Sequence, residues 1–308
     1  MTEDFPKNEV EFDRRFRDEQ ACHDYLFKLR WPEGFICSEC GHSFYWKTSR
    51  ELYVCRNCEY QQSVTAGMIF HGTRKPLIVW FKALWWFSTC KSGVNAVALK
   101  ELLGFGSYQT AWCWLQKLRT CTIFPSRTQL TGKVEADEFY LGGERSGKRG
   151  RGAEHKCKVV VAIERRGYQL GRLRMQVIDN CSGDELIPFV ENNVAAGSQV
   201  ITDGWKGYNG LEKKGYAHQK VLSSKTSDKD SILPGVHLVI SLVKRVILGT
   251  FQGRFDSIYL QRYLDEYVFR FNRRTTKSVG KRFWRIMQRA VSSSPVTNMA
   301  VRLTPVES

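Results

Sequence analysis

The hydrophobic pattern in the middle of the chain, residues 133–221, is that of strands, because apolar and polar side chains largely alternate. Helical spacing interrupts this pattern over residues 183–194 and again after Trp205. The order is therefore three strands, a helix, a strand and a helix, which is an α/β arrangement. The four predicted strands cover residues 133–141, 156–164, 168–179 and 198–203.

Before this region, residues 76–119 have the apolar spacing of helices. Gly104 breaks that pattern, and Ser107 is placed to cap a second helix. A helix, a short glycine turn and a helix form the helix-turn-helix arrangement, although small helical bundles share it. In the DNA-binding interpretation the second helix enters the major groove, with Tyr108, Gln109 and Lys117 on its exposed side.

After it, helical spacing returns over residues 237–250 and 257–274, and the apolar stripe predicted for the first of these helices is Val236, Ile240, Val243 and Ile247. Residues 242–290 carry twelve Lys or Arg against three acids. This C-terminal part is therefore predicted to be helical and strongly basic.

Charge adds a partner to this picture. The chain has 47 Lys and Arg against 31 Asp and Glu, a net charge of +16, although residues 1–24 hold eight acids against four bases. Such an excess usually marks a polyanion such as nucleic acid, and a merely soluble basic surface is the alternative. Outside the helix-turn-helix, the predicted DNA contacts are Lys148, Arg149 and Arg151 of the glycine-rich segment 142–156, with Lys244, Arg245, Arg273 and Arg274.

The glycine-rich segment itself is expected to be a mobile loop near phosphates, or else a solvated hairpin tip. The chain contains no apolar run of the roughly 18 residues that a membrane span requires, and its acidic start has no apolar leader segment. We therefore expect a soluble, cytoplasmic protein without a membrane partner.

Four of the ten cysteines have the spacing of a metal site. Cys37 and Cys40 form one pair, Cys55 and Cys58 form another, and fourteen residues separate the pairs. Two such knuckles can place four thiolates around one structural zinc ion. A disulfide framework is the less favoured alternative in a reducing compartment.

Acidic residues in the predicted strands suggest a second kind of metal site. Glu135 and Asp137 share one face of a strand, and Asp203 ends another strand. If the strands are adjacent, Asp137 and Asp203 would repel each other unless a divalent cation lay between them. Oxygen ligands of this kind suit Mg²⁺ or Mn²⁺. The alternative is that each acid is structural or lies on the surface.

At this point the chain resembles a known family, the zinc-ribbon, DDE-type transposases of bacterial insertion sequences, an ISXO-like group related to the eukaryotic Merlin group. The matching segments are the cysteine knuckles, VEADEFYLGG, VITDGWKGY, VHLVISLVKRVILGTFQG and LQRYLDEYVFRFNRR. The resemblance implies a ribonuclease H-like (RNase H-like) catalytic core that cuts and joins DNA by two-metal-ion phosphoryl transfer. Water and then a 3′ hydroxyl would be the nucleophiles.

Carried onto this sequence, the family pattern makes Asp137 and Asp203 catalytic metal ligands. The third position falls on His237, where an acid or Asn is common, and that departure leaves metal preference open. Lys244 follows two helical turns later on the same face, where it could hold a phosphate. Glu135 is the alternative third ligand.

The resemblance also implies double-stranded DNA as partner, both the terminal inverted repeats and the target, with a homo-oligomer at the synapsed ends and a nucleoid-associated location. The alternative is a catalytically impaired or domesticated sequence-specific DNA-binding protein. A tyrosine recombinase using Tyr263 or Tyr267 is weakly supported. The predicted domains are a zinc-ribbon segment (1–72), a helix-turn-helix-like domain (73–130), an RNase H-like domain (131–275) and a basic tail (276–308).

Overall fold

A computed structural model describes residues 3–142, 156–222, 233–251 and 256–303. The chain divides into two compact units, one built from residues 1–124 and 276–304 and the other chiefly from residues 125–275. The predicted four-domain boundaries stay predictions. In the described part of the chain, no helix is long and apolar enough to cross a membrane.

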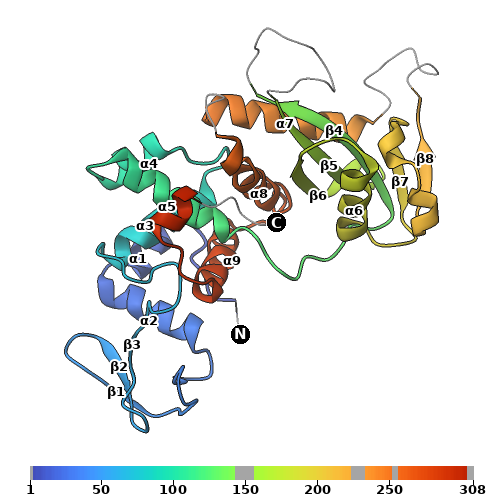
Figure 1. Ribbon diagram of the computed structural model, residues 1–308. Helices are drawn as coiled ribbons and strands as arrows, with labels where there is room; N and C mark the ends of the chain where they lie inside the picture. The colour runs from blue at the N-terminus through green and yellow to red at the C-terminus, as the bar shows by residue number, and fades with distance from the viewer. Residues whose placement is uncertain (1–2, 143–155, 223–232, 252–255, 304–308) are drawn as a thin grey trace. The chain divides into compact units, whose positions relative to one another are not determined.

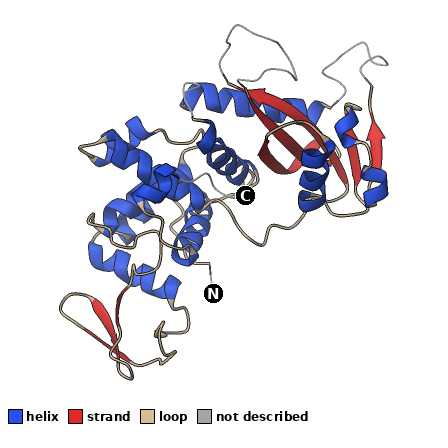
Figure 2. Ribbon diagram, viewed as in Figure 1, coloured by secondary structure: helices blue, strands red, loops and turns tan. Residues whose placement is uncertain are grey.

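The first unit is mainly helical, with a small antiparallel sheet (Figures 1 and 2). The sheet order is β1-β2-β3, in which β2 pairs with both neighbours. The helices are α1 (Glu9–Arg15), α2 (Glu19–Arg30), α3 (Leu77–Thr89), α4 (Ala96–Leu103), α5 (Tyr108–Thr120), α9 (Val279–Ser292) and α10 (Asn298–Leu303), and the strands are β1 (Tyr45–Lys47), β2 (Leu52–Cys55) and β3 (Gln61–Ser63).

Aromatic side chains fill the core of this unit. The Phe283 ring of α9 lies edge-on to Phe12, Phe81 and Trp85, with ring centroids 5.7, 6.2 and 5.6 Å away. On α3 the Trp80 ring stacks on Trp114 of α5 at 3.5 Å. Helix α9 lies within residues 276–308, which the sequence predicted only as a basic tail. Its buried side chains, among them Phe283, Ile286 and Met287, belong to this core.

The turn between α4 and α5 forms as its residues predict. Gly104 ends α4 in the left-handed region, at φ 61°, which glycine adopts without the steric cost of a side chain. The Ser107 side chain then accepts a hydrogen bond from the Gln109 amide and caps α5. The apolar face of α5 is buried as predicted, at Ala111, Trp114, Leu115 and Leu118.

The second unit contains a five-stranded sheet with the order β6-β5-β4-β7-β8. Strands β6, β5 and β4 are antiparallel, and β4, β7 and β8 are parallel. The strands are β4 (Lys133–Leu141), β5 (Cys157–Arg166), β6 (Gln169–Ile178), β7 (Gln199–Thr202) and β8 (Ala217–Lys220), and the helices are α6 (Gly183–Asn193), α7 (Pro234–Thr250) and α8 (Leu260–Phe271).

The two faces of β4 meet different helices (Figure 1). Val134 and Ala136 join the core that contains Phe189 of α6. The odd-numbered side chains of β4 face α7, whose predicted apolar stripe is buried at Val236, Ile240, Val243 and Ile247.

Helix α8 lies along β6, an edge strand of the sheet. The Asn272 side chain accepts a hydrogen bond from the Leu173 amide at 2.7 Å and donates to its carbonyl at 3.1 Å. Gln261 likewise accepts from the Val177 amide at 2.8 Å. Side chains of the LQRYLDEYVFRFNRR segment therefore satisfy backbone groups that a further strand would otherwise pair.

Two sequence predictions about this unit need correction. The helix expected after Trp205 is replaced by two short 3₁₀ turns, Lys206–Tyr208 and Leu211–Lys214, because glycines in the left-handed region bound the second turn at Gly210 and Gly215. Strand β8 was not predicted, because its four residues carry no apolar alternation.

Candidate active site and zinc site

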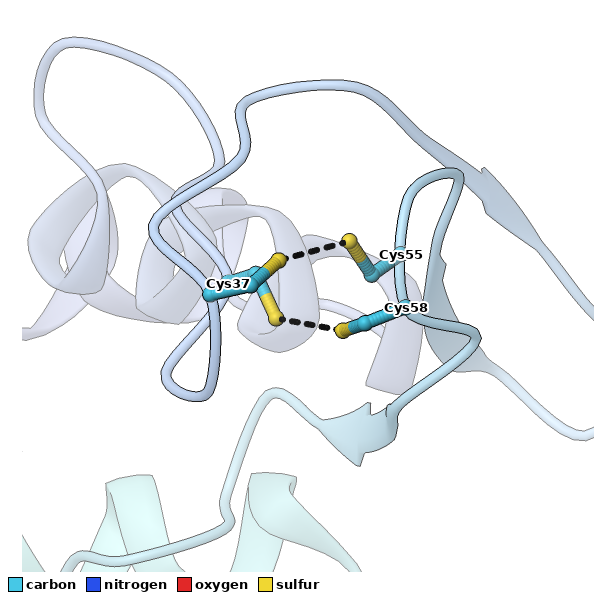
Figure 3. A group of neighbouring side chains, drawn as sticks. Cys37, Cys55 and Cys58 are labelled. Carbon is cyan, nitrogen blue, oxygen red and sulfur yellow. Dashed lines mark hydrogen bonds between the residues drawn. The ribbon is translucent and has the colours of Figure 1, made fainter.

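The four predicted zinc ligands meet beside the β1-β2-β3 sheet (Figure 3). Cys37 Sγ lies 3.6 Å from Cys58 Sγ, Cys40 Sγ lies 3.5 Å from Cys55 Sγ, and all four ligand atoms lie within 4.8 Å of one another. Zinc–sulfur bonds of about 2.3 Å in a tetrahedron set the sulfurs about 3.8 Å apart. The cysteine cluster therefore fits one zinc ion.

Hydrogen-bond donors favour the thiolate at Cys40, whereas at Cys58 the Tyr60 backbone donor is outweighed by the hydrogen bond with the Cys40 thiol and by burial, which raise the pKa. A hydrogen bond from the His42 backbone, with help from Asn57, lowers the pKa of the Cys40 thiol to about 6. The Asn57 amide also lies 3.4 Å from Cys55 Sγ and donates to it. Because zinc binds the thiolate form, these donors support the metal-site interpretation over four inert thiols.

The two predicted catalytic acids come from neighbouring parallel strands, Asp137 from the middle of β4 and Asp203 from the position directly after β7. The register of β4 and β7 pairs Lys133 with Gln199 and Glu135 with Ile201. Asp137 and Asp203 each follow the last of these pairs by two residues, so the same register, extended by two residues, would set them side by side. Asp203 Oδ1 accepts a hydrogen bond from the Trp205 amide at 2.9 Å, which holds the turn after β7.

Helix α7 brings His237 to Asp137. His237 Nε2 lies 3.5 Å from Asp137 Oδ2, and the two side chains are 36% and 13% exposed. The Asp137 carboxylate also accepts from the Glu138 amide through Oδ1 at 2.8 Å. The middle of β4 and the first turn of α7 thus present an acid and an imidazole together at a partly open surface.

Within the described ranges, the four cysteines are the cluster of potential metal ligands whose atoms all come within 4.8 Å of one another. Asp137, Asp203 and His237 do not form such a cluster. Burial first, and then the carboxylates of Glu138, Asp137 and Asp203, raise the pKa of Tyr208 well above the usual value. A cation beside these carboxylates would reduce their mutual repulsion.

Glu135 has a different environment from Asp137, although they share a strand face. Its side chain is 6% exposed, and its Oε1 lies 3.3 Å from Arg165 Nη1 on β5. Its Oε2 accepts a hydrogen bond from the Val236 amide of α7 at 2.8 Å. The residue predicted as the alternative third ligand therefore already has two partners within the fold.

Lys244 lies farther along α7, with its Nζ 5.9 Å from the centroid of the Phe139 ring. Phe139 is two residues beyond Asp137 on the same face of β4. Lys244 and Arg245 are both exposed. The residues from His237 to Lys244 thus run along β4 from Asp137 to Phe139.

The other predicted DNA contacts differ in their surroundings. On α5, Tyr108 is 51% exposed and Gln109 is exposed, whereas Lys117 is half-buried and burial lowers its pKa. At the end of α8 the Arg273 guanidinium lies over the Phe269 ring, and Arg274 donates to the Gly171 carbonyl at 3.2 Å. The predicted contacts Lys148, Arg149 and Arg151 lie outside the described residues.

An open hollow of about 560 Å³ lies next to Asp203, and sequence reasoning did not anticipate it. The Trp205 indole borders it and donates to the Cys181 carbonyl at 2.7 Å. Only the aromatic and basic residues directly after Asp203 could have signalled it. The lining consists of Asn180, Cys181, Ser182, Gly183, Trp205, Lys206 and Gly207.

Comparison with known proteins identifies two matching families. Residues 129–272 match the family model described as the ISXO2-like transposase domain, and residues 17–61 match the transposase zinc-ribbon domain. An uncharacterized protein in transposable element ISH50 of Halobacterium salinarum is 24% identical over 221 residues, which cover 65% of this chain and 72% of that protein. The matched ranges contain the four cysteines, Asp137, Asp203 and His237.

Proposed function

We propose, from the premise that the chain is a zinc-ribbon transposase of the ISXO2-like group, that it cuts DNA at the ends of an insertion sequence and joins them to target DNA. The observation that carries this proposal is the approach of His237, on α7, to 3.5 Å from Asp137. The β4–β7 register supports it, because its extension by two residues would set Asp137 beside Asp203.

The sheet supports an RNase H-like core. Three antiparallel strands, β6, β5 and β4, are continued by the parallel strands β7 and β8, and helix α6 lies between β6 and β7 in the chain. In such a core the first acid lies on the central strand and the second at the end of the parallel strand beside it. Asp137, on β4, and Asp203, directly after β7, are consistent with those two places.

The side chains present suit Mg²⁺ or Mn²⁺. Asp137 and Asp203 supply hard carboxylate oxygens, and His237 supplies an imidazole nitrogen that Mn²⁺ accepts more readily than Mg²⁺. When bound, the ions would polarise the scissile phosphate and lower the pKa of the attacking hydroxyl group. The protein's own part is to hold these three side chains at one edge of the sheet.

Basic side chains near these ligands would hold the DNA. Lys244 lies along α7 beside Phe139, where its ammonium can pair with a backbone phosphate. Helix α5 and its exposed Tyr108 and Gln109 form the helix-turn-helix part of the proposal, with the zinc ribbon as a second element of end recognition. The partners are the terminal repeats, target DNA and further copies of this chain.

A second candidate function is a DNA-binding protein that no longer transfers strands. The observation that favours it is the environment of Glu135, which is held by Arg165 and the Val236 amide. If His237 does not serve as the third ligand, the nearest acid on that strand face is already engaged.

Cleavage of DNA carrying the element's own terminal repeats, measured across Mg²⁺ and Mn²⁺ titrations, separates these two functions. Asp137→Asn and Asp203→Asn should abolish cleavage and leave end binding nearly intact, because they remove metal ligands and not phosphate contacts. His237→Ala should be severely impaired, and His237→Glu should retain activity with Mg²⁺. Asp184→Asn, on an exposed acid of α6, is the matched control.

End binding without nicking by the wild-type protein in either ion would instead favour the DNA-binding function. Wild-type rates for His237→Ala would remove the histidine from the ligand set.

A further inference from the structure

Helix α7 carries His237 but does not cap its own N-terminus. Leu233 stands at the N-cap and Pro234 at the first turn, and no side chain of this segment caps the helix. The first amides of a helix have no partner within it and must be satisfied from outside. In α7 that partner comes from strand β4, because Glu135 Oε2 accepts from the Val236 amide at 2.8 Å.

Arg165 holds the Glu135 carboxylate that accepts the hydrogen bond from the Val236 amide. Its Nη1 lies 3.3 Å from Glu135 Oε1, so the two oxygens of one carboxylate join β5 to the start of α7. Arg165 is diagonal to Glu135 across the β4–β5 ladder, where Lys133 is its direct partner. The side chains of Glu135 and Arg165 are only 6% and 19% exposed, so water screens the pair weakly.

The helix start also fits this pair without spare room. A Cβ on Gly235 would lie 2.6 Å from Arg165 Nη1, 2.9 Å from Glu135 Oε2 and 2.9 Å from a methyl carbon of Leu170. A methyl group at this position would therefore displace the ends of the Arg165, Glu135 and Leu170 side chains. The next residues are Val236, whose amide is held, and His237.

We propose that Glu135 is a positioning residue for the metal site. Together with Arg165 and Gly235, it fixes where the first turn of α7 lies against β4. That position sets the 3.5 Å distance between His237 Nε2 and Asp137 Oδ2. Glu135 touches neither DNA nor metal in this assignment; it acts through the helix that carries the ligand. The inference rests on the proposed function for its metal, but its first test needs no DNA cleavage.

The first measurement is Mn²⁺ affinity of the intact protein, read by electron paramagnetic resonance, with Asp137→Asn to identify the site. Glu135→Ala should weaken this affinity by about tenfold, as loss of a group that orients a ligand does. Glu135→Gln keeps an oxygen acceptor for the Val236 amide and should stay within about threefold of the wild type. The cleavage assay should show the same order, with end binding unchanged.

A second pair of variants tests the same position without removing the acid. Gly235→Ala inserts a methyl group into the cluster and should also weaken Mn²⁺ binding by about tenfold. Gly249→Ala, in the same helix, meets nothing within 4 Å and should behave as the wild type.

Wild-type Mn²⁺ affinity in folded Glu135→Ala or Gly235→Ala would overturn the proposal. Unfolding of both variants would overturn it too, because Glu135 would then maintain the fold and not the position of the helix. A third outcome separates the two proposals. If Mn²⁺ binding depends on Asp137 and weakens in Glu135→Ala, but the wild-type protein never cleaves DNA, the positioning role stands and the proposed function is refuted.

Discussion

Glu164, on β5, shows how completely surroundings decide what a carboxylate does. Its oxygens accept hydrogen bonds from the Thr131 amide at 3.0 Å and from the Arg172 amide and Nε, each at 3.0 Å. Burial raises the pKa of this carboxyl, but the hydrogen bonds from Arg172 and Thr131 outweigh it and lower the pKa to about 2. The ionised form is therefore part of the folded structure.

This pKa predicts a stability that depends on pH. The folded pKa is below the ordinary value of 4.5, so the stabilisation is complete above about pH 4.5 and is lost as the pH falls toward about 2. Glu164→Gln should lower the free energy of unfolding of its unit by on the order of 2–3 kcal/mol near pH 7. The deficit relative to the wild type should shrink through that window in urea titrations.

Glu185→Gln, on the first turn of α6, is the comparison that leaves this network untouched. A Glu164→Gln deficit that is equally large at pH 2 and pH 7 would contradict the assignment.

Glu135 and Asp137 mark the limit of prediction at this scale. The two-residue period of a strand predicts that they share a face, and both do meet α7. The period says nothing of which acid is engaged within the fold, because Arg165 lies on another strand and Val236 is 101 residues away from Glu135. Residue identity and spacing therefore predicted that Glu135 and Asp137 lie on one face. They did not predict that Glu135 pairs with Arg165 and Val236 while Asp137 lies near His237.

Among the elements, those with a strong periodic pattern were predicted and those specified by a tertiary partner were not. The apolar stripe of α7 and the Ser107 cap of α5 are confirmed because each is set by nearby residues. Strand β8 is polar and short, so its partner β7 specifies it. Two helices without local caps, α3 and α7, receive them from Glu19 and Glu135.

The strands β1, β2 and β3 beside the four cysteines together span only ten residues. So small a sheet buries little apolar surface, and we therefore expect its stability to depend on the metal. We expect about one zinc ion per chain in reduced wild-type protein. Cys55→Ser should lose most of it, since three thiolates remain around a site that needs four. Elemental analysis and end-binding titrations check both statements.

Cys157→Ser, on β5 outside the cluster, should keep its zinc and its DNA affinity. A full zinc complement in Cys55→Ser, or none in the reduced wild type, would rule out the four-cysteine site.

At the scale of the whole molecule, one unit is built chiefly from a single stretch, residues 125–275, whereas the other joins two long stretches, residues 1–124 and 276–304. Residues 276–304 return to the first unit, and α9 places Phe283 among the rings of Phe12, Phe16 and Trp85. A fragment of residues 1–124 should therefore lack a cooperative thermal transition, whereas residues 125–275 should show one. Joining residues 276–304 to the first fragment by a flexible linker should restore it.

Cooperative melting of residues 1–124 alone would show that α9 is dispensable to that core. The same linked fragment carrying Phe283→Ala is the sharper comparison, because it keeps the helix and removes one buried ring. Its free energy of unfolding should fall by about 3–5 kcal/mol, and its melting temperature should fall accordingly.

The return of α9 to the first unit also orders events during synthesis. At about 5–20 residues per second, the ribosome needs about 10–40 s to proceed from residue 124 to residue 304. Throughout that interval the aromatic face that awaits Phe283 is open to chaperones, while residues 125–275 can already fold. In a nascent chain, synthesis of the unit that carries Asp137 and Asp203 is therefore complete before the first unit, which carries the four-cysteine cluster, receives Phe283 and can close its core.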